Sequence, residues 1–348
     1  MRTLAALLLL FCPALLPAAD TLDFYIIDVE GGKAVLVVTP ARQAMLIDAG
    51  WPGLQDEKNQ TYKITDRDTD RIVAAVRKVG VKQIDYFVVT HYDQDHGANV
   101  ERVAARMPIP IRAYVDHGEP VSQSREAQDG YASYMRAVGS TKRMVVRPGD
   151  RIPLAGADVA VVTSAGEVLK SPLPGGGTPN PLCSSEPASP ARGENPASVG
   201  LVFTFGKFRT IDLSDLPKAK ERELICPNNP VGAADLLLVS HHAFDMSNLP
   251  LLVHALRPVA AIVNNGERHG GQAVAWQTVR DSPGLEDIWQ MHLTPAAGKE
   301  HNAPEQFIAN LSEANCQAHW IQVAARRDGS FRVTNARNGF SKTYRRRN

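Results

Sequence analysis

The sequence has no excess of charge of either sign: its 348 residues include 38 Lys and Arg against 37 Asp and Glu. A protein that binds nucleic acid usually carries a basic excess or a basic stripe, so the balance gives no strong nucleic-acid signature. The one basic run, from Lys342 to Arg347, is typical of a solvated chain end. With 44% hydrophobic residues, the composition is that of an ordinary globular protein with a large core.

Long apolar runs are absent after the first twenty residues, so no segment of the mature protein is expected to enter a membrane. The N-terminus is different. Arg2 precedes an apolar stretch from Leu4 to Leu16, and the small residues Ala18-Ala19 follow it. This order is typical of a secretory signal peptide. We therefore expect a signal peptide over 1–19, a mature protein over 20–348 and a secreted or periplasmic location.

Cysteine is scarce, and only Cys183, Cys226 and Cys316 remain after the expected cleavage. Their spacing matches no thiolate metal site. In an oxidising compartment two of them can form a disulfide, and Cys183 with Cys226 is the preferred pair. The odd count leaves one cysteine that we expect to be buried and unreactive.

Regular elements are predicted from the spacing of apolar residues. Ile72, Val76 and Val79 share one helical face, and Gly80 is a plausible C-cap. The segment 171–196 is rich in Pro, Gly and Ser and is expected to form a long irregular loop. No repeat and no linker divides the chain, which favours a single domain over 20–348. Strands are expected at 22–29, 33–39, 44–50 and 84–90, helices at 70–80, 97–106, 272–280 and 305–313, and a hairpin turn at Asp328-Gly329.

The segment VVTHYDQDHGANV, residues 88–100, places His91, Asp93, Asp95 and His96 within six positions. It follows a predicted strand and precedes a predicted helix. Neutral imidazole and ionised carboxylate are ligands that suit Zn²⁺ and Mn²⁺. Four such ligands are more than one divalent ion easily uses, so the pattern predicts a two-metal site. The alternative is a polar loop in which His caps a helix and Asp pairs with Arg, and it requires all four residues to coincide by chance.

This motif resembles the H-x-[HD]-x-D-H signature of the metallo-β-lactamase fold superfamily. Asp93 stands where the common form has His, as in the branch similar to the soluble domain of the DNA-uptake protein ComEC. Three further segments resemble that branch in the same order, and the resemblance runs from about Leu22 to His269. It implies an α+β fold, a four-layer αβ/βα sandwich of two mixed β-sheets flanked by helices. The three segments are DVEGGKAVLVVTPARQAMLIDAG, ENPASVGLVFTFGKFRTIDLSDL and DLLLVSHHAFDMSN.

The resemblance also implies roles for single residues. His91 and Asp93 take the first metal position, Asp95 and His96 take the second, and Asp215 bridges both ions. Without the resemblance, Asp215 is predicted to be a turn residue at a strand end. Asp212 is the competing choice for the bridging carboxylate, although its side chain is expected to point into the sheet.

The adjacent residues His241 and His242 are expected to have different roles. His241 is predicted to be a metal ligand, and His242 a proton donor or substrate contact. His269 either completes the second site or binds substrate, and the alternative is a surface-loop His.

The sequence departs from the family where a third His is usual, because Asn195 stands at about that place. An amide is a poorer ligand, so one site is expected to be weaker or selective for a harder ion such as Mn²⁺. Asp28 and Asp48 match motif positions and are expected to be structural or to orient ligand imidazoles.

The implied activity is that of an exported metallohydrolase with two divalent ions. Zn²⁺ is the preferred ion, and Mn²⁺ is the alternative. A metal-activated hydroxide attacks a phosphoester or phosphodiester, and Asp95 orients the nucleophile and relays a proton. The expected partner is a small-molecule or phosphodiester substrate. Two alternatives stay open: a lactonase or β-lactamase acting on a cyclic carbonyl, and a non-catalytic binding module with a structural metal. The serine-hydrolase motif G-x-S-x-G is absent.

Overall fold

A computed structural model describes residues 20–56, 61–183 and 191–345 of the chain. The predicted signal peptide, 1–19, lies outside these described residues. Among them, no helix is both long and apolar enough to cross a membrane.

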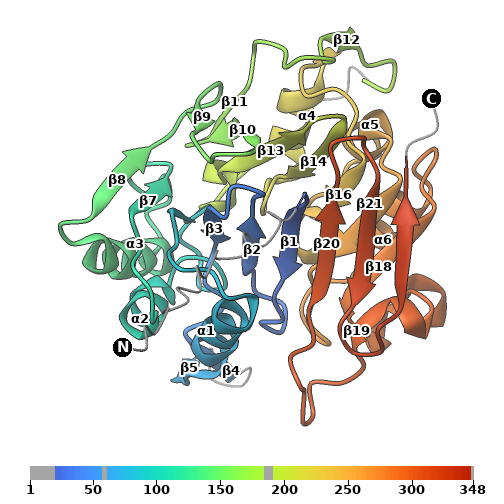
Figure 1. The fold of residues 1–348 in the computed structure, drawn as a ribbon. Coiled ribbons are helices and arrows are strands. Elements are labelled where there is room, and N and C mark those ends of the chain that lie inside the picture. Colours follow the sequence, from blue (N-terminus) through green and yellow to red (C-terminus); the bar gives the residue numbers. More distant parts are fainter. Residues whose placement is uncertain (1–19, 57–60, 184–190, 346–348) are drawn as a thin grey trace, which may run out of the picture.

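Two large β-sheets face one another, and each has nine strands within the described part of the chain (Figure 1). The first is antiparallel from β22 to β3 and parallel from β3 to β8. In spatial order it contains β22 (Ser341–Tyr344), β21 (Phe331–Asn335), β20 (Ile321–Ala325), β1 (Leu22–Ile26), β2 (Val35–Val38), β3 (Ala44–Ile47), β6 (Tyr86–Val88), β7 (Ala113–Asp116) and β8 (Lys142–Val145).

The second sheet is also mixed, with parallel pairing from β14 to β19. Two short two-stranded ribbons lie outside the large sheets, β4 (Gly53–Asp56) with β5 (Thr61–Ile64), and β12 (Thr178–Pro179) with β15 (Asn228–Asn229). In spatial order the second sheet contains β11 (Glu167–Val168), β10 (Asp158–Ser164), β13 (Gly200–Phe205), β14 (Phe208–Asp212), β16 (Leu236–Leu238), β17 (Ala260–Val263), β18 (Asp287–His292) and β19 (Ile308–Asn310), and β9 (Arg151–Ile152) pairs with β10.

The main core lies between the two sheets. Phe24 of β1 meets Phe203 of β13 edge to face, with ring centroids 5.2 Å apart, and Phe208 of β14 meets Phe331 of β21 at 5.3 Å. Such large apolar faces are stable only when another layer covers them. The inner faces of the sheets therefore form the two middle layers of the molecule.

Helices cover both outer faces (Figure 1). The outer face of the first sheet packs on α1 (Arg67–Val79), α2 (Val100–Arg106) and α3 (Arg125–Val138), through residues such as Leu46, Ile72 and Tyr134. The second sheet packs on α4 (Lys218–Ile225), α5 (Pro250–Leu256) and α6 (Ala273–Arg280), through residues such as Leu252 and Trp276. The predicted four-layer αβ/βα sandwich is confirmed.

Several local predictions are confirmed and one is wrong. Helix α1 ends at Gly80, which has the left-handed conformation of a C-cap, and a hairpin joins β20 to β21 around Asp328-Gly329. The predicted helix at 305–313 is instead a single 3₁₀ turn, Glu305–Phe307, followed by β19. The apolar residues of this stretch, Phe307 and Ile308, enter the core beside β18, where strand pairing outweighs helical spacing.

The loop 171–196 is irregular over most of its described length, as predicted, although β12 interrupts it. A disulfide joins Cys183 to Cys226, with Cα atoms 5.8 Å apart, so the predicted pair is confirmed. At its C-terminal end the loop enters a 3₁₀ turn at Asn195–Ala197, which leads into β13.

Candidate metal centre

The predicted metal ligands come from loops that follow strands of both sheets. The segment His91–His96 lies between β6 and α2 of the first sheet. Asp215 follows β14, and the pair His241–His242 follows β16, in the second sheet. Strands β14 and β16 are parallel neighbours, so their carboxyl ends lie at the same edge of the sheet. The structure brings the ligand loops of both sheets together there.

Four of the predicted residues form a compact, buried group. Ligand atoms of Asp95, His96, Asp215 and His242 all lie within 4.8 Å of one another. His96 Nε2 is 3.3 Å from Asp215 Oδ1 and 3.2 Å from His242 Nε2. His242 Nε2 is 3.2 Å from Asp95 Oδ2. The residue expected to be a proton donor, His242, is thus part of the tightest group.

A looser group adjoins the first one through Asp215. His241 Nε2 is 3.4 Å from Asp215 Oδ2 and 3.3 Å from the side-chain nitrogen of Asn195. His91 Nε2 is 3.6 Å from Asp93 Oδ2. This buried Nε2 has no hydrogen-bond partner among the described residues. Asp215 joins His241 to the compact group, and the ring centroid of His91 lies 4.1 Å from that of His96.

Hydrogen bonds on the far side of the rings fix the tautomers of His96 and His242. His96 Nδ1 lies 2.9 Å from the carboxylate of Asp48, and His242 Nδ1 lies 2.8 Å from the carbonyl oxygen of Asn264. The ionised carboxylate of Asp48 and the carbonyl oxygen of Asn264 can only accept hydrogen bonds, so each Nδ1 carries a proton. Each Nε2 of the neutral ring then presents a lone pair to the group, which is the arrangement found in metal-ligating histidines.

His241 is oriented in the same way by Ser247. The hydroxyl of Ser247 donates to the carbonyl oxygen of Leu216 at 2.7 Å. Its oxygen therefore accepts from His241 Nδ1, 3.2 Å away, and His241 Nε2 is left facing Asp215. Three imidazoles thus point Nε2, the unprotonated nitrogen of the neutral ring, at one carboxylate.

The separations within the compact group fit a bound cation. Ligand atoms placed 2.0–2.2 Å from an ion at tetrahedral angles are about 3.3–3.6 Å apart. The Nε2 and Oδ atoms of Asp95, His96, Asp215 and His242 are 3.2–3.5 Å apart in the pairs that contact. These residue types at these separations can hold a divalent metal ion.

Electrostatics within the group favour positive charge. Burial opposes ionisation of Asp95 and Asp215, but the neighbouring imidazoles outweigh it and hold the pKa of both carboxyls well below the usual value. Burial also opposes a charged His242, but Asp215 and Asp95 outweigh it and raise the pKa of this imidazole to about 9. Burial lowers the pKa of His241.

The backbone that carries the two imidazoles is unusual. His241, His242 and Ala243 have φ angles of 51°, 51° and 63°, all in the left-handed region. Such a conformation costs a residue other than Gly about 1–3 kcal/mol. Gly270 passes so close that a Cβ there would lie 2.2 Å from the carbonyl oxygen of His242. The amide of the next residue, Gly271, donates to that oxygen at 2.8 Å and helps to hold the turn.

His269 lies at the edge of the compact group. Its Nε2 is 3.6 Å from Asp95 Oδ2. Its ring meets Trp51 and Phe244 edge to face, with centroids 5.2 and 4.7 Å away. Its side chain is 31% exposed, so the site reaches solvent on this side.

The other carboxylates named from the sequence have supporting contacts. Asp48 orients His96 and also accepts from the amide and hydroxyl of Thr90, as expected of a residue that orients a ligand. Asp212 forms a buried ion pair with Lys33 and accepts from the amide of Ser214.

Sequence reasoning did not find Ser247 and Asn264, which set the tautomers of the His pair. Ser247 lies five residues after His242, and Asn264 follows β17, the strand next to β16. The adjacency of β16 and β17 was the signal for Asn264, since parallel neighbours end at the same edge.

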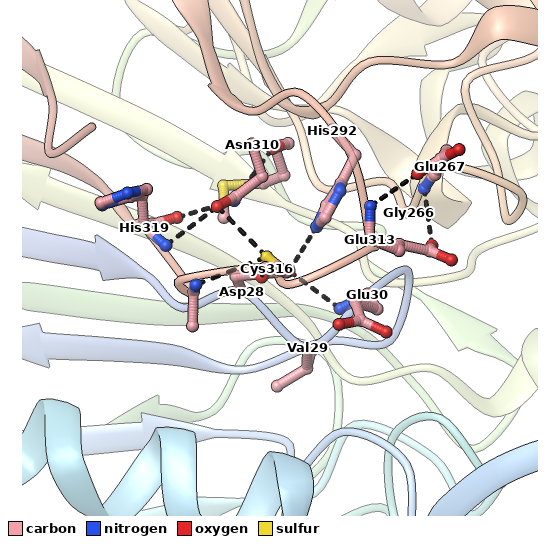
Figure 2. Close-up of polar contacts among 12 residues, drawn as sticks. Asp28, Val29, Glu30, Gly266, Glu267, His292, Asn310, Glu313, Cys316 and His319 are labelled. Carbon is pink, nitrogen blue, oxygen red and sulfur yellow. Dashed lines mark hydrogen bonds and ion pairs between the residues drawn. The ribbon is translucent and has the colours of Figure 1, made fainter. Parts of the chain in front are cut away.

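A second cluster, Asp28, His292 and Cys316, also places possible ligand atoms within 4.8 Å of one another (Figure 2). Its geometry is that of a hydrogen-bonded hub. His292 Nε2 is 2.7 Å from Asp28 Oδ1, and the thiol of Cys316 is 3.1 Å from Oδ2. Arg71 also donates to this carboxylate at 3.1 Å. Burial opposes ionisation of Asp28, but His292 and Arg71 outweigh it and lower its pKa to about 2.

The tautomer of His292 is the reverse of that in the metal group. Its Nε2 carries the proton given to Asp28, while its buried Nδ1 has no hydrogen-bond partner within the described residues. A metal on Nε2 would move the proton to this partnerless nitrogen and bring a dication close to Arg71. Cys316 is only partly buried, contrary to expectation, but burial and then Asp28 raise the pKa of its thiol to about 12, so it is unreactive as expected.

The fold and the His/Asp group define an αβ/βα sandwich protein with a site suited to divalent metal ions. Residues 27–185, which include the His91–His96 motif, match the model of the family described as the metallo-β-lactamase superfamily. The chain has the metallo-β-lactamase fold. The ComEC-type branch stays a prediction. No curated protein sequence matches the chain.

Solved structures with this fold resemble the chain at low identity. A Cronobacter sakazakii metallo-β-lactamase with a HARLDQ motif is 18% identical, with a TM-score of 0.33, over 57% of this chain and 64% of that chain, less than two thirds of its length. The metallo-β-lactamase fold protein YhfI from Bacillus subtilis is 10% identical, with a TM-score of 0.44, over 77% and 96%. CmlA, a diiron β-hydroxylase from Streptomyces venezuelae, is 17% identical, with a TM-score of 0.37, over 78% and 48%.

Proposed function

We propose that this chain is an exported hydrolase that uses divalent metal ions to cleave a phosphoester or phosphodiester. One observation carries the proposal. The Nε2 atoms of His96, His241 and His242 converge on the buried carboxylate of Asp215, and Asp95 adds a second carboxylate. Imidazole and carboxylate together suit Zn²⁺ and Mn²⁺.

Two metal positions follow from the two groups. We assign Asp95, His96 and His242 to one position and His91, Asp93 and His241 to the other, with Asp215 shared. This assignment differs from the expectation that His242 is a proton donor, because the ring of His242 lies in the compact group and its Nδ1 is bound to Asn264. Asn195 borders the looser position, where a flipped side-chain amide offers its oxygen as a weak ligand.

Divalent ions at these positions supply Lewis-acid activation of water and offset the negative charge that develops on a phosphoryl or carbonyl oxygen. The protein supplies orientation. Asp95 Oδ2 lies within 3.6 Å of imidazole nitrogens of His96, His242 and His269, and we assign it the orientation of the nucleophile. His269 is partly exposed beside it and contacts substrate at the opening of the site.

The accessibility of the site supports an enzyme over a binding module with a structural metal. The Asp93 side chain is 26% exposed, and that of His269 is 31% exposed. Structural metal sites are usually closed by protein ligands, whereas catalytic sites keep a position open to water or substrate.

The donor set supports the choice of a phosphoester. Asp93 and Asn195 each stand where the usual family pattern has a histidine. The looser position therefore has more oxygen donors than that pattern. Oxygen donors favour harder ions such as Mn²⁺. The resemblance of the H-x-D-x-D-H motif to phosphodiester-cleaving relatives points the same way.

Metal content followed by a substrate panel tests the proposal. The mature protein is purified without chelator, reconstituted with Zn²⁺ or Mn²⁺, and assayed on p-nitrophenyl phosphate, bis-p-nitrophenyl phosphate, a lactone and a β-lactam. We expect about two bound ions and turnover of a phosphate ester that a chelator abolishes. Protein that binds no metal contradicts the proposal, and turnover of the lactone or β-lactam alone favours the cyclic-carbonyl alternative.

The disulfide between Cys183 and Cys226 supports the export part of the proposal, because disulfides persist in oxidising compartments. The mature N-terminus should lie at or near Asp20. Intact mass of the exported protein measures it, and retention of Met1 contradicts export by a cleaved signal.

A further inference from the structure

A second turn, residues 247–249, holds the strained His241–His242 turn from behind. The side chain of Asn248 bonds both backbone groups of Ser240, accepting from its amide at 3.2 Å and donating to its carbonyl oxygen at 2.9 Å. Ser247 in the same turn orients the ring of His241. The conformation of this second turn therefore sets where the His pair begins.

One buried carboxylate fixes the second turn. Glu221 Oε1 accepts from the amide of Asn248, and Oε2 accepts from the amide of Leu249, both at 2.7 Å. Glu221 is fully buried. Its two oxygens thus hold two successive amides of a turn in which Asn248 itself has a left-handed φ of 66°.

Glu221 also belongs to the segment that carries the shared ligand. Helix α4 begins at Lys218, three residues after Asp215, and the amide of Lys218 donates to the carbonyl oxygen of Met246 at 3.0 Å. Helix α4 therefore connects the Asp215 loop directly to the turn that holds His241 and His242. A single side chain couples the positions of ligands that arrive on different strands.

We propose that Glu221 is a positioning residue of the metal centre, which clamps the 247–249 turn and through it sets the placement of His241 and His242 relative to Asp215. This inference rests on the proposed metal centre, because the placement matters only if the imidazoles bind an ion. A carboxyl group is required, because both of its oxygens accept, and the hydroxyl oxygen of the protonated form still can. The amide of Gln has one acceptor and would point its NH₂ at the other backbone N–H.

The test compares Glu221→Gln with Glu223→Gln. Glu223 lies on the same helix, but its side chain is exposed and pairs with Lys170 and Lys220. A third variant, Asn248→Gly, tolerates the positive φ and removes only the bonds to Ser240. Metal affinity is measured by competition with a chromophoric chelator, and coordination by the visible spectrum of the Co²⁺-loaded protein.

We expect Glu221→Gln and Asn248→Gly to weaken metal binding about 10–100-fold, as removal of partners behind metal ligands typically does. Their Co²⁺ spectra should also change, whereas Glu223→Gln should match the wild type. A folded Glu221→Gln protein with wild-type affinity and spectrum overturns the inference. If Glu221→Gln does not fold, Asn248→Gly decides by the same two measurements.

Hydrogen exchange of the metal-free protein separates this inference from the proposed function. Peptides that cover 238–250 should exchange about tenfold faster in Glu221→Gln than in Glu223→Gln, because the clamped amides open. Equal exchange refutes the clamp. A wild type that binds no metal refutes the proposed function and with it the positioning role, even if the exchange shows that the clamp exists.

Discussion

His96 Nε2 and His242 Nε2 face one another at 3.2 Å, and Nδ1 of each ring donates a hydrogen bond on the far side. Two lone pairs at this distance repel unless a proton or a metal ion lies between them and their carboxylate neighbours. Asp48 and Asn264 hold the rings in this arrangement from outside the group. Buried hydrogen bonds therefore hold a geometry that positive charge, from protons or from a metal ion, makes favourable.

Removal of Asp215 should empty both metal positions. The carboxylate faces His96, His241 and His242, and a shared carboxylate offsets the repulsion between two ions roughly 3.5–4 Å apart. Asp215→Ala should lose most bound metal and essentially all hydrolysis, with an unchanged circular dichroism spectrum. The exposed Asp129→Ala variant is the control, and full metal content in Asp215→Ala contradicts the assignment.

His91→Ala should affect one position only. Its Nε2 lies beside Asp93, outside the compact group. We expect this variant to lose about one of the two ions, measured by elemental analysis after dialysis against metal-free buffer. Loss of both ions from His91→Ala would mean that the two positions are not separable.

Replacement of Asn195 should strengthen the looser position. The side-chain nitrogen of Asn195 lies 3.3 Å from His241 Nε2, so an imidazole there adds a good ligand in place of a poor one. Asn195→His should bind its more weakly held ion about tenfold more tightly, the lower end of effects seen around metal ligands. Asn195→Ala separates loss of the amide from gain of the ring. Equal titration curves for all three proteins contradict the prediction.

The free energy of unfolding of the metal-free protein should depend on the ionisation of Glu221. Burial raises the pKa of its carboxyl from 4.5 to about 7, although two backbone amides oppose the shift. Because the folded pKa is the higher one, the stabilising contribution is complete below about pH 4.5 and is lost as the pH rises to about 7. The loss is about 3 kcal/mol at most. Urea unfolding at pH 5 and pH 7.5 should show it in the wild type and not in Glu221→Gln, and parallel pH profiles contradict it.

The disulfide should stabilise the fold without shaping the metal centre. It closes a loop with a sequence separation of 43 residues, for which chain entropy gives about 4 kcal/mol. The double variant Cys183→Ser, Cys226→Ser should unfold at a lower temperature in calorimetry and keep its metal content. Cys316→Ser is the control. Loss of metal from the double variant would show that the loop supports the site.

The types of the candidate ligand residues, and their places directly after strands, could be predicted from the sequence. The His91–His96 motif and Asp215 follow strands, and strand ends of neighbouring parallel strands meet. The placement of both the His241 and the His242 ring beside Asp215 could not be predicted. Adjacent residues normally point apart, and only the left-handed backbone turns both rings toward Asp215.

Asp48 was expected to orient an imidazole, but the sequence could not predict which one, and Asn264 was not found. Asp48 and His96 are 48 positions apart, and Asn264 and His242 are 22 apart. Nothing in their spacing pairs them before the strands are placed. The helix predicted at 305–313 failed for a related reason, because the site beside β18 selects a strand from an ambiguous apolar run.

The ligand loops are divided between the two sheets: His96 belongs to the first, and Asp215 and His242 to the second. A metal ion bound at this seam therefore acts as a folding ligand, since it binds only when both halves of the chain are in place. At a free metal concentration of 100 times the dissociation constant, this linkage adds about 2.7 kcal/mol to the free energy of unfolding. For the exported hydrolase that we propose, the local supply of metal would then set the lifetime of the protein as well as its activity.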